Sequence, residues 1–178
     1  ISITCQSTND TLKLLEENKL DVGRIGKPES LKNIDFYYLA EIKDIFVATK
    51  DYLRNLKARG VKENRILQSS TIMLLDKNNM TRQYIDDYLQ VNHIVVQDSI
   101  DISSMDLLIE FAKISVGVAC VIREFVKKEL ADGSLIEIPL GFPIHKREVG
   151  FAYKKSVKPS KSLELFVDFY KSHELLHS

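Results

Sequence analysis

The stretch from Ser104 to Phe125 constrains the fold more than any other part of this sequence, because its pattern changes from that of a helix to that of a buried strand. Two serines that can cap a helix precede apolar residues at near-helical spacing: Ser103 and Ser104, then Leu107, Leu108, Phe111, Ala112 and Ile114. Ser115 and Gly117 mark the change, and a nearly unbroken apolar run from Val116 to Ile122 follows. Such a run is typical of a strand buried on both faces, as in a parallel sheet. The stretch therefore predicts a helix, a turn of small residues and a buried strand.

The same order of elements is predicted near the start of the chain. Residues 10–17 (DTLKLLEE) place Leu12 and Leu15 on one helical face, and residues 20–25 (LDVGRI) have the pattern of a short strand. Two helix-to-strand units far apart in the sequence favour two α/β lobes over one continuous sheet. The length of 178 residues fits one domain or two small lobes.

The remaining periodicity completes the prediction of secondary structure. Strand patterns lie at residues 1–4, 34–39, 42–49, 93–97, 135–140 and 149–153, with further apolar runs at 66–68 and 72–75. Helical patterns lie at 51–58, 80–90 and 123–131, and from a cap at Ser160 or Ser162 to Tyr170. Segments 26–33 and 76–79 have the composition of loops.

Four stretches, taken in order, resemble the effector-binding regulatory domain of LysR-type bacterial transcriptional regulators. They are STNDTLKLLEENKLDVGRIG (7–26), EIKDIFVATKDYL (41–53), LLIEFAKISVGVACVIREFV (107–126), and DGSLIEIPL (132–140) with REVGFAYKKSVKPSKSLELFVDFY (147–170). Two positions depart from the family pattern V-x-x-G-x-G-x-x-x-x-P. Ser115 stands where the family has its first glycine, and Ile122 stands where it has proline. We therefore expect the turn and the cleft edge to be built differently in this chain.

The resemblance implies the fold class, which is α/β with two Rossmann-like lobes joined by two crossover strands, as in type 2 periplasmic binding proteins. It assigns residues 1–45 to lobe I, residues 46–135 to lobe II and residues 136–178 to the return into lobe I. In the family, another strand and helix precede the strand that residues 1–5 (ISITC) resemble, and a winged helix-turn-helix DNA-binding domain precedes both. We expect these elements to lie outside this chain.

The resemblance also places a small-molecule effector in the cleft between the lobes. Six residues are candidate cleft residues: Ser7, Thr8, Ser70, Asn78, Gln97 and Ile122. Thr8 carries the most weight, because a carboxylate at the mouth of a helix meets unpaired backbone N–H groups as well as the hydroxyl. Capping alone would also explain Ser7 and Thr8, and a solvated turn would explain Asn78. Since few cationic side chains fall near these positions, the expected effector is a small carboxylate or an amino-acid-like compound.

Charge and composition exclude several partners. The 25 basic residues balance 25 acidic ones, so the chain lacks the basic excess of a surface that binds DNA, and DNA would be bound through the separate N-terminal domain. No apolar run approaches the roughly 18 residues of a membrane span, so we expect no membrane partner and a cytoplasmic location. The two cysteines, Cys5 and Cys120, lie in apolar runs and are interpreted as buried free thiols.

The sequence contains no catalytic constellation, so we expect no enzymatic activity, no cofactor and no metal. Residues 173–177 (HELLH) fit the zinc motif H-E-x-x-H. A catalytic zinc needs a third protein ligand, and no sequence motif indicates one. We expect a ligand-sensing domain that acts as a homodimer or homotetramer, in which the effector shifts the populations of two lobe arrangements. A solute-binding protein of a transport system is the alternative. An enzyme of the prephenate or hydroxymethylbilane type is more distant, because its catalytic residues are not found.

Overall fold

The computed structural model describes residues 2–4, 6–28, 30–31, 33–155 and 160–174, with side chains described as far as residue 170. These residues form two compact units, which we call unit 1 (Ile1–Ala40 and Glu148–Ser178) and unit 2 (Glu41–Arg147). Residues 41–45 and 136–147, which the family resemblance assigns to the first lobe, belong to unit 2. The reason is that Ile138 and Ile144 are buried in an apolar core of unit 2.

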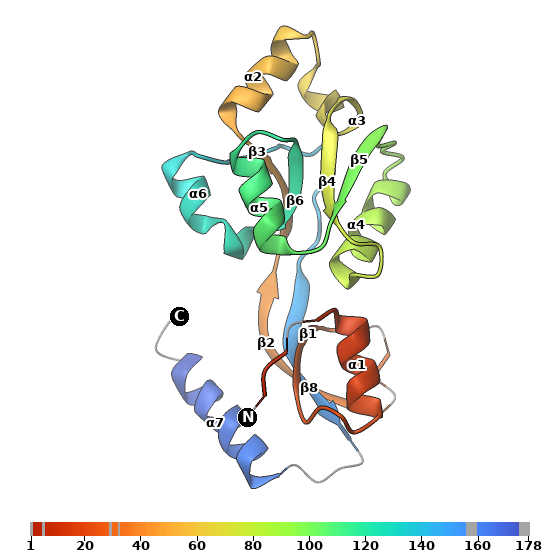
Figure 1. Ribbon diagram of the computed structural model, residues 1–178, viewed down its shortest axis with the longest axis vertical. Coiled ribbons are helices and arrows are strands. Elements are labelled where there is room, and N and C mark those ends of the chain that lie inside the picture. Colours follow the sequence, from red (N-terminus) through yellow and green to blue (C-terminus); the bar gives the residue numbers. More distant parts are fainter. Residues whose placement is uncertain (1, 5, 29, 32, 156–159, 175–178) are drawn as a thin grey trace. The chain divides into compact units, whose positions relative to one another are not determined.

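A five-stranded mixed sheet forms the centre of unit 2, with strand order β5-β4-β6-β3-β7 (Figure 1). Its strands are β3 (Asp44–Ala48), β4 (Thr71–Leu75), β5 (Asp98–Ile102), β6 (Val118–Ile122) and β7 (Ile136–Glu137). β4 pairs in parallel with β5 and β6, whereas β3 runs antiparallel to β6 and β7. The carboxyl ends of β4, β5 and β6 therefore lie at the same edge of the sheet as the start of β3.

Helices cover both faces of this sheet, and alternate residues of its strands belong to opposite cores. Ile72 and Leu74 of β4 pack in one apolar cluster with α2, α3 and α4, whereas Met73 and Leu75 pack in another with α5. The helices of unit 2 are α2 (Lys50–Ala58), α3 (Ile66–Ser69), α4 (Met80–Val91), α5 (Met105–Lys113) and α6 (Lys127–Asp132), with 3-10 turns at Glu63–Arg65 and Arg123–Phe125.

The stretch from Ser104 to Phe125 has the predicted order of helix, turn and buried strand. Ser104 caps α5 by accepting a hydrogen bond from the Leu107 backbone N–H, and the first four residues of β6 are buried. Ser115 adopts a left-handed backbone conformation with φ of 65°, which glycine adopts more readily. A Cβ on Gly117 would lie 2.5 Å from the carbonyl oxygen of Thr71. The turn thus keeps the shape that glycines favour, although serine occupies its first position.

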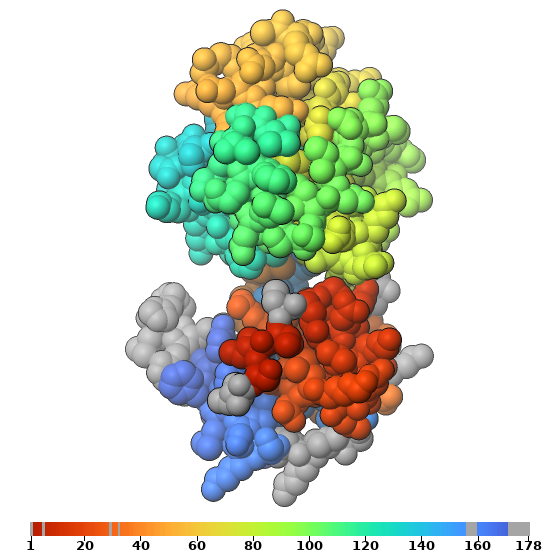
Figure 2. Space-filling model, in the orientation of Figure 1, coloured from red at the N-terminus to blue at the C-terminus, as the bar shows by residue number. Residues whose placement is uncertain are grey.

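Unit 1 contains a three-stranded sheet of order β1-β8-β2. Its elements are α1 (Thr8–Glu16), β1 (Gly23–Gly26), β2 (Ile34–Ile42), β8 (Arg147–Lys154) and α7 (Lys161–Glu174). Leu15 of α1 packs in an apolar cluster with Ile25 and Ile34. The rings of Phe166 and Tyr170 on α7 lie 5.2 and 5.0 Å from that of Phe151 on β8. α7, blue in Figure 2, lies at the surface of unit 1.

β2 and β8 each contain residues of both units, so they are the two strands that join the units, as the fold class requires. The segments expected to make these crossovers, residues 42–49 and 135–140, lie wholly within unit 2. The predicted helices at 10–17, 51–58 and 80–90 correspond to α1, α2 and α4. The last predicted helix begins where expected, because Ser160 accepts a hydrogen bond from the Leu163 backbone N–H. Within the described residues, no helix is both long enough and apolar enough to cross a membrane.

Several strand predictions are wrong. Residues 2–4 are exposed and have no regular structure. Residues 93–97 form the turn after α4, where His93 has φ of 54° and Ile94 and Val96 pack against a core without entering the sheet. The strand lies directly after this segment, as β5. β5 forms one edge of its sheet and its first four residues are exposed, so it lacks the apolar pattern by which buried strands are found.

Two other predicted elements are shorter than expected. The predicted strand at 135–140 is a strand only at Ile136–Glu137, after which the Ile138 backbone N–H makes one further hydrogen bond, of 2.8 Å, to the carbonyl oxygen of Phe46 in β3. The predicted helix at 123–131 is divided into a 3-10 turn and α6, and Gly133 ends α6 with φ of 75°.

Candidate functional site

The candidate functional site in unit 2 is the edge of the sheet at which its parallel strands end. In open α/β sheets, ligands bind in the crevice outside the carboxyl ends of the strands. Here that edge is formed by the last residues of β4, β5 and β6, which are Leu75, Ile102 and Ile122, together with Asp44 at the start of β3. Asp44 pairs with Ile122, and Leu75 pairs with Ile102. We call this end of the sheet the carboxyl edge.

A buried ion pair lies at the carboxyl edge. Arg147, the first residue of β8, donates from Nε to Asp44 Oδ2 at 2.7 Å and from Nη2 to Asp44 Oδ1 at 2.9 Å. Nη2 also donates to Thr81 Oγ1 at 3.2 Å, and the guanidinium lies 5.0 Å from the centre of the Tyr84 ring. The side chain of Asp44 is fully buried and that of Arg147 is 13% exposed. The pair thus joins the starts of β3 and β8 to the first turns of α4.

Burial controls the electrostatics of this pair. Burial raises the pKa of the Asp44 carboxyl above its ordinary value, and the hydrogen bonds and charge of Arg147 act in the opposite direction without cancelling the rise. Burial likewise raises the pKa of Tyr84, and the negative charge of Asp44 adds to this effect. Nη1 of Arg147 makes no hydrogen bond with any described residue. Two guanidinium N–H groups are therefore available to an acceptor on a ligand.

A second arginine fixes the carboxyl edge from within. Arg82 of α4 is buried, and its Nη1 donates to the carbonyl oxygen of Leu75 at 2.8 Å and to Asp101 at 2.6 Å. Its Nε donates to Asp86 at 2.8 Å. Arg82 therefore ties the end of β4 to β5 and to α4. Because its Nε and Nη1 are engaged by the protein and its side chain is only 7% exposed, we assign it a structural role.

The predicted residues Asn78 and Ile122 both lie at the carboxyl edge. Asn78 belongs to the turn between β4 and α4, which ends at Asn79, the N-cap of α4. Asn79 Oδ1 accepts from the Thr81 backbone N–H at 2.9 Å, so this turn leads directly to the residue that contacts Arg147. Ile122 is partly buried at the end of β6, where the resembling family has proline.

Ser70 and Gln97 are placed at the opposite end of the sheet. Each directly precedes a strand, and the two strands begin with the paired residues Thr71 and Asp98. Ser70 is buried and donates its hydroxyl hydrogen to the carbonyl oxygen of Ile66 at 2.6 Å, whereas Gln97 is exposed. The structure therefore separates these two residues from Asn78 and Ile122, because parallel strands begin at one edge and end at the other.

Ser7 and Thr8 lie together in unit 1, at the start of α1. Ser7 is the N-cap: its Oγ accepts from the Asp10 backbone N–H at 3.1 Å and donates to Asp10 Oδ2 at 2.7 Å. Thr8 is partly buried, and its hydroxyl makes no hydrogen bond with the described residues. Ser7 is thus occupied in capping, while Thr8 retains a free hydroxyl beside a helix N-terminus.

Asp44, Thr81 and Arg147 are not among the residues expected from the sequence. Asp44 and Arg147 are separated by most of unit 2 in the chain, and no local period connects them. One signal was present, namely an acidic residue at the start of the otherwise apolar segment DIFVA, every residue of which is buried. A charge buried in such a strand needs a partner, but the sequence does not identify which cation provides it.

Other reactive groups give no site among the described residues. No cluster of three or more histidine, cysteine, aspartate or glutamate side chains there could hold a metal ion. Cys120 is buried in β6, and burial raises the pKa of its thiol well above the ordinary value, which disfavours the reactive thiolate form. Cys5 and the H-E-x-x-H stretch at 173–177 fall outside the residues whose side chains are described.

Comparison with known proteins identifies the family. The profile of the LysR substrate binding domain matches residues 1–174. The regulatory domain of HypT from Salmonella typhimurium is similar in structure, with a TM-score of 0.81 and 17% identity over 98% of this chain and 82% of that one. The regulatory domain of CcmR from Synechocystis PCC6803, in complex with 2-PG, has a TM-score of 0.80 and 14% identity over 96% and 81% of the two chains. The effector binding domain of QuiR, in complex with shikimate, has a TM-score of 0.75 and 16% identity over 97% and 80%. A comparison with curated protein sequences gave no match.

Proposed function

Since the chain belongs to the LysR substrate-binding domain family, we propose that it senses a small carboxylate or amino-acid-like effector on behalf of a transcriptional regulator. The choice of ligand rests on the guanidinium of Arg147. Its guanidinium is oriented by Asp44 and Thr81, and Nη1 remains available to a ligand at the carboxyl edge of unit 2. A carboxylate is, with phosphate, one of the acceptors that a guanidinium binds most strongly. No catalytic step is part of this proposal.

Asn78 and Thr8 are further candidate contacts. Asn78 belongs to the turn before α4, at the same edge as Arg147, and can contribute an amide to a polar effector. The Thr8 hydroxyl in unit 1 makes no hydrogen bond with the described residues and lies at a helix N-terminus, where backbone N–H groups favour an anion. The two contacts belong to different units and are tested independently.

The proposed output is a change in transcription through partners outside this chain. The formal net charge of zero does not suit a DNA-binding surface, so we propose that a separate domain binds DNA. We also propose that the chain assembles as a homodimer or homotetramer. The effector acts by binding one conformational state more tightly than another, which is the requirement for any population shift. We further propose that the protein works in the cytoplasm, where it reaches DNA.

The test is thermal unfolding with a panel of organic acids and amino acids, each paired with its amide. A ligand present at about one hundred times its dissociation constant stabilises the folded state by ~2.7 kcal/mol, which is readily measured as a shift in melting temperature. We expect an acid to stabilise the chain more than its amide, because only the acid carries the charge that Arg147 recognises.

Variants locate the site. Thr8→Ala and Asn78→Ala should each reduce the ligand-induced shift, whereas Asn55→Ala, on the exposed side of α2, should leave it unchanged. The shift is compared with and without ligand for each variant, so any loss of intrinsic stability cancels. A panel in which amides stabilise as well as acids, or a shift that neither Thr8→Ala nor Asn78→Ala alters, would refute the proposed site.

A further inference from the structure

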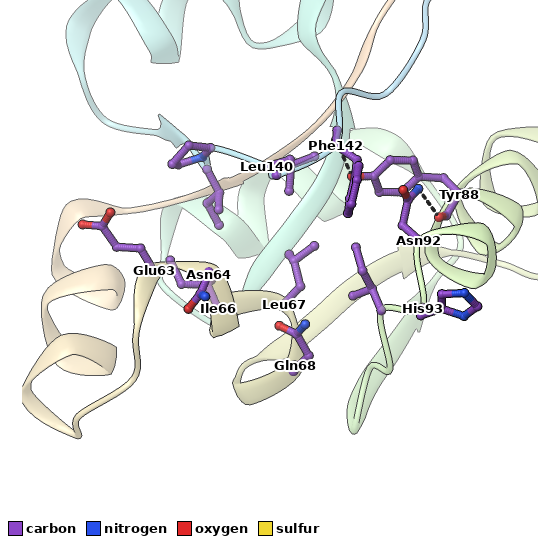
Figure 3. A pocket seen from close by; sticks show the side chains of 14 residues that line it. Glu63, Asn64, Ile66, Leu67, Gln68, Tyr88, Asn92, His93, Leu140 and Phe142 are labelled. Carbon is purple, nitrogen blue, oxygen red and sulfur yellow. Dashed lines mark hydrogen bonds between the residues drawn. The ribbon is translucent and has the colours of Figure 1, made fainter.

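Unit 2 has a pocket that lies toward the end of the sheet opposite the carboxyl edge. Figure 3 shows this pocket from close by. It has a volume of about 230 Å³ and is bounded by three segments, which are residues 63–68 before β4, the end of α4 with the following turn, and residues 138–142. α4 begins at the carboxyl edge, so its last turn marks the other end of the unit. This pocket is therefore distinct from the candidate effector site.

The outer wall of the pocket is attached to α4 by hydrogen bonds. Tyr88 donates its hydroxyl hydrogen to the carbonyl oxygen of Phe142 at 2.6 Å, and one turn earlier Tyr84 donates to the carbonyl oxygen of His145 at 3.1 Å. Asn92 donates from Nδ2 to the carbonyl oxygen of Tyr88 at 2.8 Å, and both bonds of Tyr88 are drawn in Figure 3. The Tyr88 bond holds Phe142 of segment 138–142 against α4, and the Tyr84 bond holds the chain three residues further on. The hollow is therefore a defined feature of the folded unit.

The lining combines apolar surfaces with unused polar groups. Leu140 and Phe142 lie on one side of the hollow, with Leu67 and Gln68 on the other (Figure 3). The side-chain amides of Gln68 and Asn64 make no hydrogen bond with any described residue. Each amide offers both a donor and an acceptor to a ligand. The aromatic rings of Tyr88 and Phe142 add flat apolar surface suited to another ring.

The charge of the lining selects against anions. Glu63 contributes a carboxylate and no lysine or arginine is among the lining residues, while the imidazole of His93 is directed away from the hollow in Figure 3. A carboxylate ligand would lose its hydration here without gaining a cationic partner. The volume suits one ring with a substituent, since a cavity of about 150 Å³ accommodates benzene.

We propose that this pocket is a second ligand site of unit 2, which binds a small, uncharged, planar ring that bears a hydrogen-bond donor and acceptor, such as an aromatic carboxamide. The preference for an uncharged ring is the reverse of that proposed for the carboxyl edge, where Arg147 favours a carboxylate. The two proposals therefore succeed or fail separately. A ligand in this pocket would stabilise segment 138–142, which leads along the chain to Arg147.

The test uses benzamide and benzoate, which share a shape and differ in charge. The chain contains no tryptophan, and Phe142 is 58% exposed, so Phe142→Trp introduces a single fluorescent reporter into the pocket wall. Benzamide should change the tryptophan emission in a saturable way, and benzoate should bind at least about tenfold more weakly than benzamide. Within this background, Gln68→Ala should weaken benzamide binding by about three- to tenfold through the loss of hydrogen bonds, whereas Gln90→Ala, on the exposed face of α4, should not.

A measurement without the tryptophan controls for its effect on the wall. Methyl resonances of Leu67, Ile94 and Leu140 in the unmodified 178-residue chain should shift with benzamide at the same concentrations. The proposal is overturned if benzamide gives no saturable response, if benzoate binds as tightly, if Gln68→Ala and Gln90→Ala behave alike, or if the methyl shifts fall outside the pocket.

Discussion

Replacement of Arg147 by methionine should destabilise unit 2 strongly, because it leaves the Asp44 carboxylate buried without its cation. The side chain of Asp44 is fully buried, and Arg147 contacts both of its oxygens. Loss of one partner of a buried ion pair destabilises a protein by ~3–5 kcal/mol. That is a large share of the ~5–15 kcal/mol by which a typical domain is stable. We therefore expect Arg147→Met to lower the urea midpoint of unfolding, followed by far-UV circular dichroism, by a wide margin.

The destabilisation should depend on pH in a defined direction. Burial already raises the pKa of Asp44 above the ordinary value of 3.8, and removal of Arg147, which lowers it, will raise it further. A carboxyl whose pKa is higher in the folded than in the unfolded state contributes stability below the unfolded value, and this contribution is lost as the pH rises through the folded value. Arg147→Met should therefore be less destabilising at ~pH 5 than at ~pH 7.5.

Two further variants define the cause. Adding Asp44→Leu to Arg147→Met removes the buried charge and should restore at least ~2 kcal/mol, since buried pairs are often replaced by apolar residues without loss. Lys146→Met is the matched control, because Lys146 forms an exposed ion pair with Glu41 whose contribution is below ~1 kcal/mol. Our reasoning is refuted if Arg147→Met is no more destabilising than Lys146→Met at neutral pH, or if its effect is the same at both pH values.

Three other predictions concern β6 and the turn before it. Ser115→Ala should destabilise the chain by ~1 kcal/mol in urea unfolding, because it removes the 2.6 Å hydrogen bond to Thr49 and keeps the left-handed backbone. Ser115→Gly relieves the backbone conformation and should be nearly neutral. Equal losses of stability in the two variants would contradict this prediction. Gly117→Ala should destabilise by ~1–3 kcal/mol in the same assay, because its Cβ would lie 2.5 Å from the Thr71 carbonyl oxygen, and an unchanged midpoint would argue against this close approach. The Cys120 thiol should react with a disulfide reagent only at the rate of unfolding, which is checked by mass mapping with and without urea; rapid labelling of the folded chain would show that it is accessible.

Local patterns predicted the elements that have strong periodicity or clear caps. Ser104 followed by apolar residues at helical spacing identified α5, and the apolar run behind it identified β6 as a strand buried on both faces. The same reasoning failed for β5, since an exposed edge strand has no apolar pattern. The apolar pattern of residues 93–97 wrongly predicted a strand, because the apolar side chains of this segment pack against the core without entering the sheet. Periodicity reports burial, and burial does not require a place in the sheet.

Residues close together in the chain and motifs in a fixed order were enough to identify the family, the α/β class and the candidate caps of α1 and α5. Tertiary structure alone decided which candidates share an edge. Asn78 and Ile122 lie at the carboxyl edge, whereas Ser70 and Gln97 precede their strands and lie at the opposite end. It also decided that Asp44 is paired with Arg147, since a buried carboxylate needs a cation but its own sequence neighbourhood does not specify one.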